Sequence, residues 1–249
     1  MQVYLRHVHL EIAVDAPDHP TAWRLLDTLR AVLYSRGLKP TVAPFATSYS
    51  LNAYAGINSR GSETLRAKLP DGLRDGIQAK ETKVQAWPTE LFLTCHRGGP
   101  DLTEMITPED FLSAVEACAI WQRIEDKHSA ARVIRNALVK APLMPDLSSS
   151  ILHMWQALEN LFGISSEITY RVSLLLAELC VPVAPRSTTY TTAKASYGDR
   201  SKIAHGSNSP VVDAQWQRAW GLLQNVSKAI LHRGSIPSAN DLTDELLNR

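Results

Sequence analysis

Apolar residues recur every three or four positions from Thr107 to the end of the chain, in segments separated by short stretches that contain glycine or proline. This is the period of an amphipathic α-helix, whose apolar face has to be covered by other helices. Because the stretches between the segments are short, consecutive helices are expected to be antiparallel neighbours in an up-down bundle. We therefore predict an all-α helical bundle over residues 104–249.

The helices can be bounded by capping residues at their starts and by glycine or proline at their ends. The predicted starts are Thr107-Pro108, Ser148–Ser150, Ser165 or Ser166, about Thr188, and about Asp213, with one short further helix around Leu242 and Leu246. The predicted inward faces are Phe111, Val115, Cys118 and Trp121; Ile151, Trp155, Leu158, Leu161 and Phe162; Ile168, Val172, Leu175 and Leu179; and Trp216, Trp220, Leu223, Val226 and Ile230. Whether the segment 125–128 divides the first of these helices stays open.

The first hundred residues contain both the helical period and the two-residue alternation of a β-strand. Residues 8–14 alternate between apolar and polar side chains, which predicts a half-buried strand. A helix is expected from Pro20 to Gly37, followed by strands within 41–57 and 84–95. The predicted fold class is therefore α+β, with a small α/β region at residues 1–100 that holds a sensor or partner surface, followed by the helical bundle.

Composition narrows the function classes. The net charge is +1, so any contact with nucleic acid has to come from a local basic patch. Three cysteines, Cys95, Cys118 and Cys180, are widely spaced and odd in number, which argues against a disulfide framework and favours a reducing compartment. No apolar run reaches the roughly 20 residues of a membrane span. We expect a cytoplasmic protein with no membrane contact.

The helix predicted over 188–204 carries the residues with the clearest chemistry, Arg200 and His205. Histidine titrates near neutral pH and can move a proton, and arginine can stabilise the charge that a phosphate gains in a transition state. Neither role needs a metal ion. Five residues turn a regular helix by about 500°, which leaves the two side chains about 140° apart. They can converge if the helix loosens at Gly206, or if two protomers each supply one of them.

Without further information this pair also fits a surface arginine and a histidine that is stabilised by a helix C-terminus. Glu159 fits an ion pair inside the bundle, Tyr197 fits packing, and Arg171 fits an exposed helix position. Lys202 belongs to a modest basic stretch that begins at Arg186 and also fits a solvated face. Possible metal ligands at His7, His9 and Glu11 fit the solvated or partner-facing side of a half-buried strand better. Cys95 and His96 are a possible ligand pair with no second pair nearby, so no metal site is expected.

Three segments resemble the Apea-like branch of the HEPN superfamily, over about residues 108–232. The string Tyr197-x-x-Arg200-Ser201-x-x-x-His205-Gly206 is similar to the signature of that branch. The segment Leu158-Glu159-x-Leu161-Phe162 is similar to its preceding helix, and Arg171 with the leucines that follow it fits the next part of the pattern. One departure is Gly198, a poor helix former inside the motif helix.

The resemblance implies an endoribonuclease with Arg200 and His205 as catalytic residues. It places Ser201 at the polar position after the arginine and Glu159 where it can orient the arginine, with Tyr197, Lys202 and Arg171 as supporting residues. It implies RNA as the partner, no cofactor, and a homodimer formed through the motif helices.

Relatives of this kind are anti-phage defence effectors or toxins, so an antitoxin or a phage-derived trigger is a possible further partner. Two alternatives stay open. The first is a non-catalytic HEPN module that binds RNA or a protein partner. The second is a toxin whose motif a nucleotidyltransferase antitoxin modifies, with Tyr197 as the candidate position.

Overall fold

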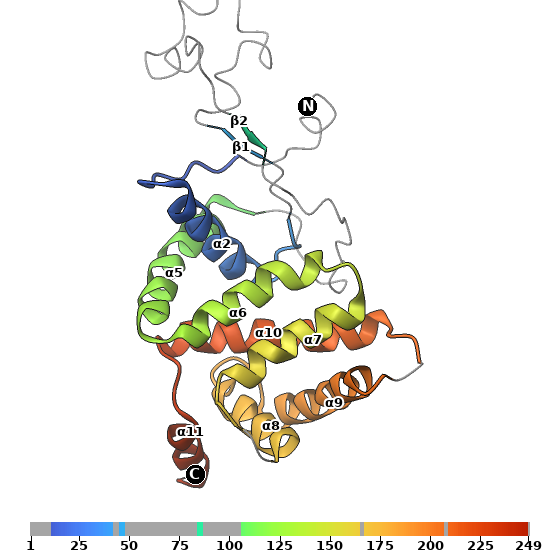
Figure 1. Ribbon diagram of the computed structural model, residues 1–249. Coiled ribbons are helices and arrows are strands. Elements are labelled where there is room, and N and C mark those ends of the chain that lie inside the picture. Colours follow the sequence, from blue (N-terminus) through green and yellow to red (C-terminus); the bar gives the residue numbers. More distant parts are fainter. Residues whose placement is uncertain are drawn as a thin grey trace, which may run out of the picture. The chain divides into compact units, whose positions relative to one another are not determined.

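The computed structural model describes residues 11–41, 45–47, 84–86, 106–164, 167–206 and 209–248 (Figure 1). The chain divides into two units. The first consists of Met1–Asp18 and Val42–Leu91, and the second of His19–Thr41 and Phe92–Arg249. Within the first unit, strands β1 (Phe45–Thr47) and β2 (Val84–Ala86) pair antiparallel with Phe45 opposite Ala86.

The second unit is a bundle of helices. Its elements are α2 (His19–Ser35), α5 (Pro108–Lys127), α6 (Ser129–Lys140), the 3₁₀ turn η3 (Ala141–Leu143), α7 (Leu147–Asn160), α8 (Ile168–Leu179), α9 (Arg186–Ala204), α10 (Asp213–Arg233) and α11 (Ala239–Leu247). In the described part of the chain, none of these helices combines the length and the apolar character that a membrane crossing requires.

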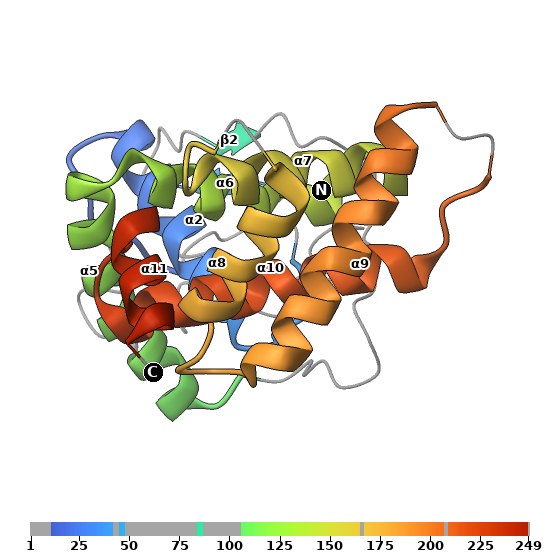
Figure 2. The same cartoon turned by 90° about the horizontal axis from the view of Figure 1, so that it is seen from below.

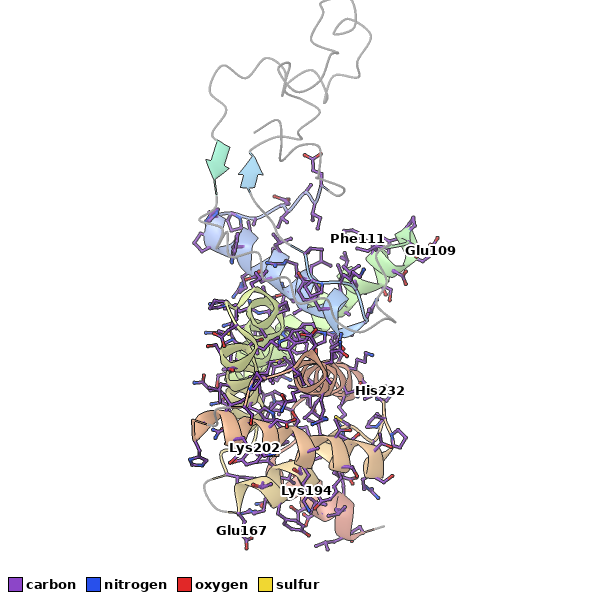
Figure 3. All side chains as sticks on the ribbon, turned by 90° about the vertical axis from the view of Figure 1, so that its right-hand side faces the viewer. Glu109, Phe111, Glu167, Lys194, Lys202 and His232 are labelled. Carbon is purple, nitrogen blue, oxygen red and sulfur yellow. The ribbon has the colours of Figure 1, made fainter. Side chains whose placement is uncertain are left out.

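Helix α10 is the centre of this unit, because it contacts each of α2, α5, α6, α7, α8 and α9. Its predicted inward face is confirmed, since Trp216, Trp220, Leu223, Val226 and Ile230 are all buried. Helices α8 and α9 lie side by side and cover α7 and α10 from one side (Figure 2). Helix α9 crosses α10 at a large angle: the view of Figure 3 shows α9 from its side and α10 nearly end-on.

The helix predicted after Pro20 is present as α2, and it belongs to the helical unit. Val32 and Tyr34 are fully buried, and α2 packs against α5, α6 and α10. This division differs from the expected boundary near residue 100. The reason is that the apolar face of α2 is buried by helices that follow it by more than 70 residues in the chain.

Buried charges join α2, α5 and α6. Glu125 accepts hydrogen bonds from Trp121 Nε1 at 2.8 Å and from Arg135 Nε at 2.6 Å. Arg135 also lies 3.9 Å from Asp27, which in turn pairs with Arg30 at 3.2 Å. Two acids and two arginines therefore balance one another inside the bundle, as buried charges must.

Helix α5 begins as predicted, because Thr107 accepts a hydrogen bond from the backbone N–H of Asp110 and the Asp110 carboxylate reaches back to Thr107. Its predicted inward face is confirmed at Trp121, which is buried, and is wrong at Val115. Val115 is 46% exposed, whereas Ala114 and Ala117 are buried beside Trp121. The small side chains of the two alanines let α5 approach its neighbours closely. A prediction that follows the spacing of large apolar side chains does not detect a face made of alanines.

Other boundaries also differ in detail. The segment 125–128 does separate two helices, since α5 ends at Lys127 and α6 begins at Ser129. The cap of α7 is Asp146 rather than Ser148–Ser150, because its carboxylate accepts from the Ser149 N–H at 2.8 Å. Ser165 and Ser166 lie outside the described residues, and α8 begins after Glu167 instead.

The expected α/β region at residues 1–100 is described only in part. Residues 11–14 form neither strand nor helix, so the strand predicted over 8–14 is absent from the part of it that the structure describes. A regular strand needs a hydrogen-bonded neighbour, and none pairs with 11–14 in the described ranges. Strands β1 and β2 fall inside the predicted ranges 41–57 and 84–95, whose other residues lie outside the described ones.

Candidate functional site

Helices α7 and α9 position the candidate residues, through a buried contact between their side chains. Trp155 of α7 is fully buried and donates a 2.9 Å hydrogen bond from Nε1 to Oγ of Ser196, which is also fully buried. The same indole lies edge-on to the ring of Tyr197, with ring centroids 5.2 Å apart. Tyr197 is half-buried, so this aromatic pair closes the edge of the core next to the motif.

Arg200 and Glu159 form an ion pair at the edge of this contact. Nη2 of Arg200 donates to Oε2 of Glu159 at 3.2 Å, and Nε lies 3.2 Å from Oε1. The Nε–Oε1 approach is electrostatic rather than a well-aligned hydrogen bond, since neither atom has a hydrogen-bond partner of good geometry among the described residues. The side chains are 28% and 24% exposed, so solvent or a ligand can reach the pair.

The guanidinium of Arg200 is held on a second side by Tyr197. Its central carbon lies 5.6 Å from the centroid of the tyrosine ring, a cation–π distance. Of the five N–H donors of the group, Glu159 engages the edge made by Nε and Nη2. The hydrogens on Nη1 are turned away from that edge, which leaves the arginine able to donate to a phosphate while it stays paired.

Asp199, next to Arg200 in α9, attaches this turn of the helix to α10. The role of Asp199 was not predicted from the sequence. Its carboxylate is buried and accepts a 2.9 Å hydrogen bond from Nε2 of Gln215 and a short one from Arg218. Gln215 also accepts from the Val212 N–H at the start of α10. The sequence signal was an acid inside a helix that otherwise carries basic and neutral residues, next to the motif arginine.

His205 is exposed at the end of α9. Helix α9 ends at Ala204, and His205 is its C-cap with φ −91° and ψ 12°. The His205 N–H still donates to the Ser201 carbonyl at 3.0 Å, and Gly206 follows with a left-handed φ of 73°. The predicted stop at Gly206 is therefore confirmed. Helical hydrogen bonding continues up to the N–H of His205, so α9 does not loosen before this residue.

Arg200 and His205 consequently do not converge within one chain. At about 100° per residue they point about 140° apart on α9. Arg200 faces α7, whereas His205 faces solvent, and the structure records no contact between the two side chains in the described residues. Of the two routes to convergence expected from the sequence, loosening of one helix is not the one this structure uses.

The remaining predicted residues lie around the pair rather than in it. Ser201 is half-buried and Lys202 exposed on α9. Arg171 is exposed on α8. In the described parts of the chain, no three His, Cys, Asp or Glu side chains are grouped so that they could hold a metal ion. His7, His9, Cys95 and His96 lie outside those parts.

Comparison with known proteins adds no relative. No family model matches the chain, and neither a curated protein nor a solved structure is similar to it at a significant level. The case for a function therefore depends on the motif and on the geometry around Arg200.

Proposed function

We propose that this protein is a metal-independent endoribonuclease of the HEPN type, with Arg200 and His205 as its catalytic residues. One observation carries the proposal. The Arg200 guanidinium is partly exposed and is held by Glu159 and Tyr197 in a way that leaves donors available. An arginine fixed in this manner costs little further ordering when it binds a phosphate.

In the proposed reaction His205 either takes the proton of the ribose 2'-hydroxyl or gives a proton to the departing 5'-oxygen. The 2'-oxygen attacks the phosphorus, and the bond from phosphorus to the 5'-oxygen breaks. Arg200 stabilises the negative charge on the pentavalent phosphate. The products are a 2',3'-cyclic phosphate and a 5'-hydroxyl.

A homodimer is part of this proposal, because Arg200 and His205 of one chain point about 140° apart on α9. A second protomer that contacts the C-terminal ends of α7 and α9 brings its His205 toward the Arg200 of the first. Each of the two composite sites then uses one residue from each chain, as two-fold symmetry allows.

The biological role we propose follows from the resemblance of the motif to HEPN proteins. It is that of an anti-phage defence effector or a toxin that acts on RNA and whose activity a trigger or an antitoxin adjusts. The region before α5 that forms the first unit is the candidate for receiving that signal.

Cleavage of total RNA in EDTA by the full chain tests the proposed activity. The wild type is expected to leave 2',3'-cyclic phosphate ends, and Arg200→Ala and His205→Ala to be inactive. His232→Ala is the matched control for the histidine, because His232 is also exposed in the last turn of a helix. Full activity of Arg200→Ala or His205→Ala refutes the proposal.

Mixing the two inactive variants tests the composite site. If each site uses Arg200 of one protomer and His205 of the other, a mixed dimer holds one intact site. Random pairing then restores about one quarter of wild-type activity. If both residues act within one chain, the mixture stays inactive.

A second candidate function is a non-catalytic module that binds RNA or a protein partner. The separation of Arg200 and His205 on α9 favours it, because a binding role needs no convergence. RNA binding by wild type and by His205→Ala alike, with no cleavage by either, is its expected result.

A further inference from the structure

The solvent-facing side of α9 differs in charge from the side that faces the bundle. On the bundle side, Arg186 pairs with Glu178 and Arg200 with Glu159. Lys194 and Lys202 are exposed, and the structure records no acidic partner for either among the described residues (Figure 3). The only acid of α9, Asp199, is buried and is bound to Arg218.

Four exposed polar residues of α9 fall on one stripe together with Gly198. At about 100° per residue, Thr191, Lys194, Gly198, Lys202 and His205 lie within an arc of about 80° around the helix axis. We call these five residues the α9 stripe. Four of them are exposed and Gly198 is partly exposed. The stripe therefore joins two lysines, a hydroxyl and the histidine of the proposed site on one continuous surface.

Gly198 lies between the lysines, one turn from each, and the fold does not require a glycine there. A Cβ added at this position meets nothing within 4 Å, and the backbone is helical. Glycine is less favourable than alanine inside a helix. One use of glycine is to let a ligand approach the backbone closely, and the open space at Gly198 allows this.

We propose that the α9 stripe binds the phosphate backbone of single-stranded RNA, with the strand passing over Gly198 toward His205. Lys194 and Lys202 are about 12 Å apart along the helix axis and contact phosphates on either side of Gly198. Lysines without acidic partners release counterions when they bind phosphates, which favours this ligand. A second copy of the chain packed over Gly198, at the middle of the stripe, would bring lysines of like charge together, whereas the proposed dimer contact lies at the C-terminal end of α9. The identity of the ligand as RNA rests on the proposed function.

Fluorescence anisotropy with a single-stranded RNA that is 2'-O-methylated throughout tests this inference, since that probe cannot be cleaved through its 2'-oxygens. Lys194→Gln/Lys202→Gln is expected to bind about tenfold more weakly than wild type, with a salt slope of log Kd shallower by about 1.4. Lys127→Gln/Lys140→Gln removes the same charge from exposed positions of α5 and α6 and should bind like wild type. Equal affinity of the two double variants overturns the proposal.

Gly198→Leu tests the path of the strand. Leucine favours a helix, and a Cβ at this position meets nothing within 4 Å, so the melting temperature should not fall. RNA affinity should weaken severalfold. Unchanged RNA affinity of Gly198→Leu overturns the proposed path of the strand over Gly198. If the RNA affinity is unchanged but sedimentation shows a changed oligomeric state, the stripe is a protein contact instead. Failure of wild type to bind the probe overturns the inference regardless of cleavage. Binding as expected without cleavage of unmodified RNA upholds the inference and refutes the proposed nuclease.

Discussion

Trp155 donates a 2.9 Å hydrogen bond to Ser196, and the ion pair of Glu159 with Arg200 lies four residues further along both helices. The buried contact thus fixes the register of α7 against α9 at which the partly exposed pair can form. The position of Arg200 beside Glu159 therefore depends on the buried Trp155–Ser196 contact.

Ser196→Ala should lower the free energy of unfolding by about 1–3 kcal/mol, because the buried indole N–H of Trp155 would lose its acceptor. Urea unfolding measures the change. Ser187→Ala, at an exposed position of the same helix, is the control and should change stability by less than about 0.5 kcal/mol. An equally small effect of Ser196→Ala would contradict the role of this contact.

Glu159→Gln should reduce RNA cleavage by about 10²-fold, because Arg200 would lose the carboxylate that orients it. Stability should change by less than about 1 kcal/mol, since the pair is partly exposed to solvent. Glu245→Gln is the control, because Glu245 holds Arg233 in a comparable partly exposed pair. Cleavage at the wild-type rate by Glu159→Gln would show that Arg200 needs no such partner.

Arg135→Met should lower the free energy of unfolding by about 3–5 kcal/mol. It leaves the buried carboxylate of Glu125 without its cation and removes one of two arginines near Asp27. Arg132→Met, at an exposed position of the same helix, is the control for helix propensity and charge. Thermal or urea unfolding of both proteins measures the difference, and equal stability would refute the importance of the network.

Burial raises the pKa of Asp27 above 3.8, and the nearby Arg30 and Arg135 only partly oppose this. The folded state therefore binds this proton more tightly than the unfolded state, which favours folding at low pH. That contribution is lost as pH rises from 3.8 through the raised pKa. The stability of Asp27→Asn relative to wild type should accordingly increase between acidic and neutral pH. Urea unfolding at both pH values tests the sign, and a decrease would contradict it.

The thiols of the bundle should be unreactive in the folded protein. Burial raises the pKa of Cys180 to about 12 and that of Cys118 to about 11. At pH 8 the thiolate fraction of Cys180 is then about 10⁻⁴, so alkylation by iodoacetamide should be slow until the protein unfolds. Peptide mapping after brief labelling, with and without denaturant, measures this. Rapid labelling of Cys180 in native protein would contradict its burial.

The sequence predicts the helices well, because each carries a strong amphipathic period and recognisable ends. The buried tryptophans Trp121, Trp155, Trp216 and Trp220 follow from that period and are confirmed. The face of α5 does not follow, because Ala114 and Ala117 are buried through close helix approach rather than through their size. Likewise, Asp146 and the three serines at 148–150 are all possible N-caps of α7 in the sequence, and only the backbone geometry shows that Asp146 is the one used.

At the candidate site, the sequence predicts the residues but not their directions. The contact of Glu159 with Arg200 agrees with the orienting role implied by the motif and equally with a plain ion pair. Asp199 with Gln215 and Arg218 could not be foreseen, since their contact depends on how α10 packs against α9. The direction of the His205 side chain depends on where α9 ends, and a shift of that end by one residue would change it.

The assignment of α2 to the helical unit has a consequence for how this protein can be dissected. The chain passes between its two units three times, at residues 18–19, 41–42 and 91–92. A protease that cuts once cannot release either unit whole. A truncation that begins at residue 104 removes α2, including the buried Val32 and Tyr34. It exposes the residues of α5, α6 and α10 that pack against α2, which favours aggregation. Residues 19–41 joined by a short linker to residues 106–249 are the fragment that keeps the bundle's interior covered.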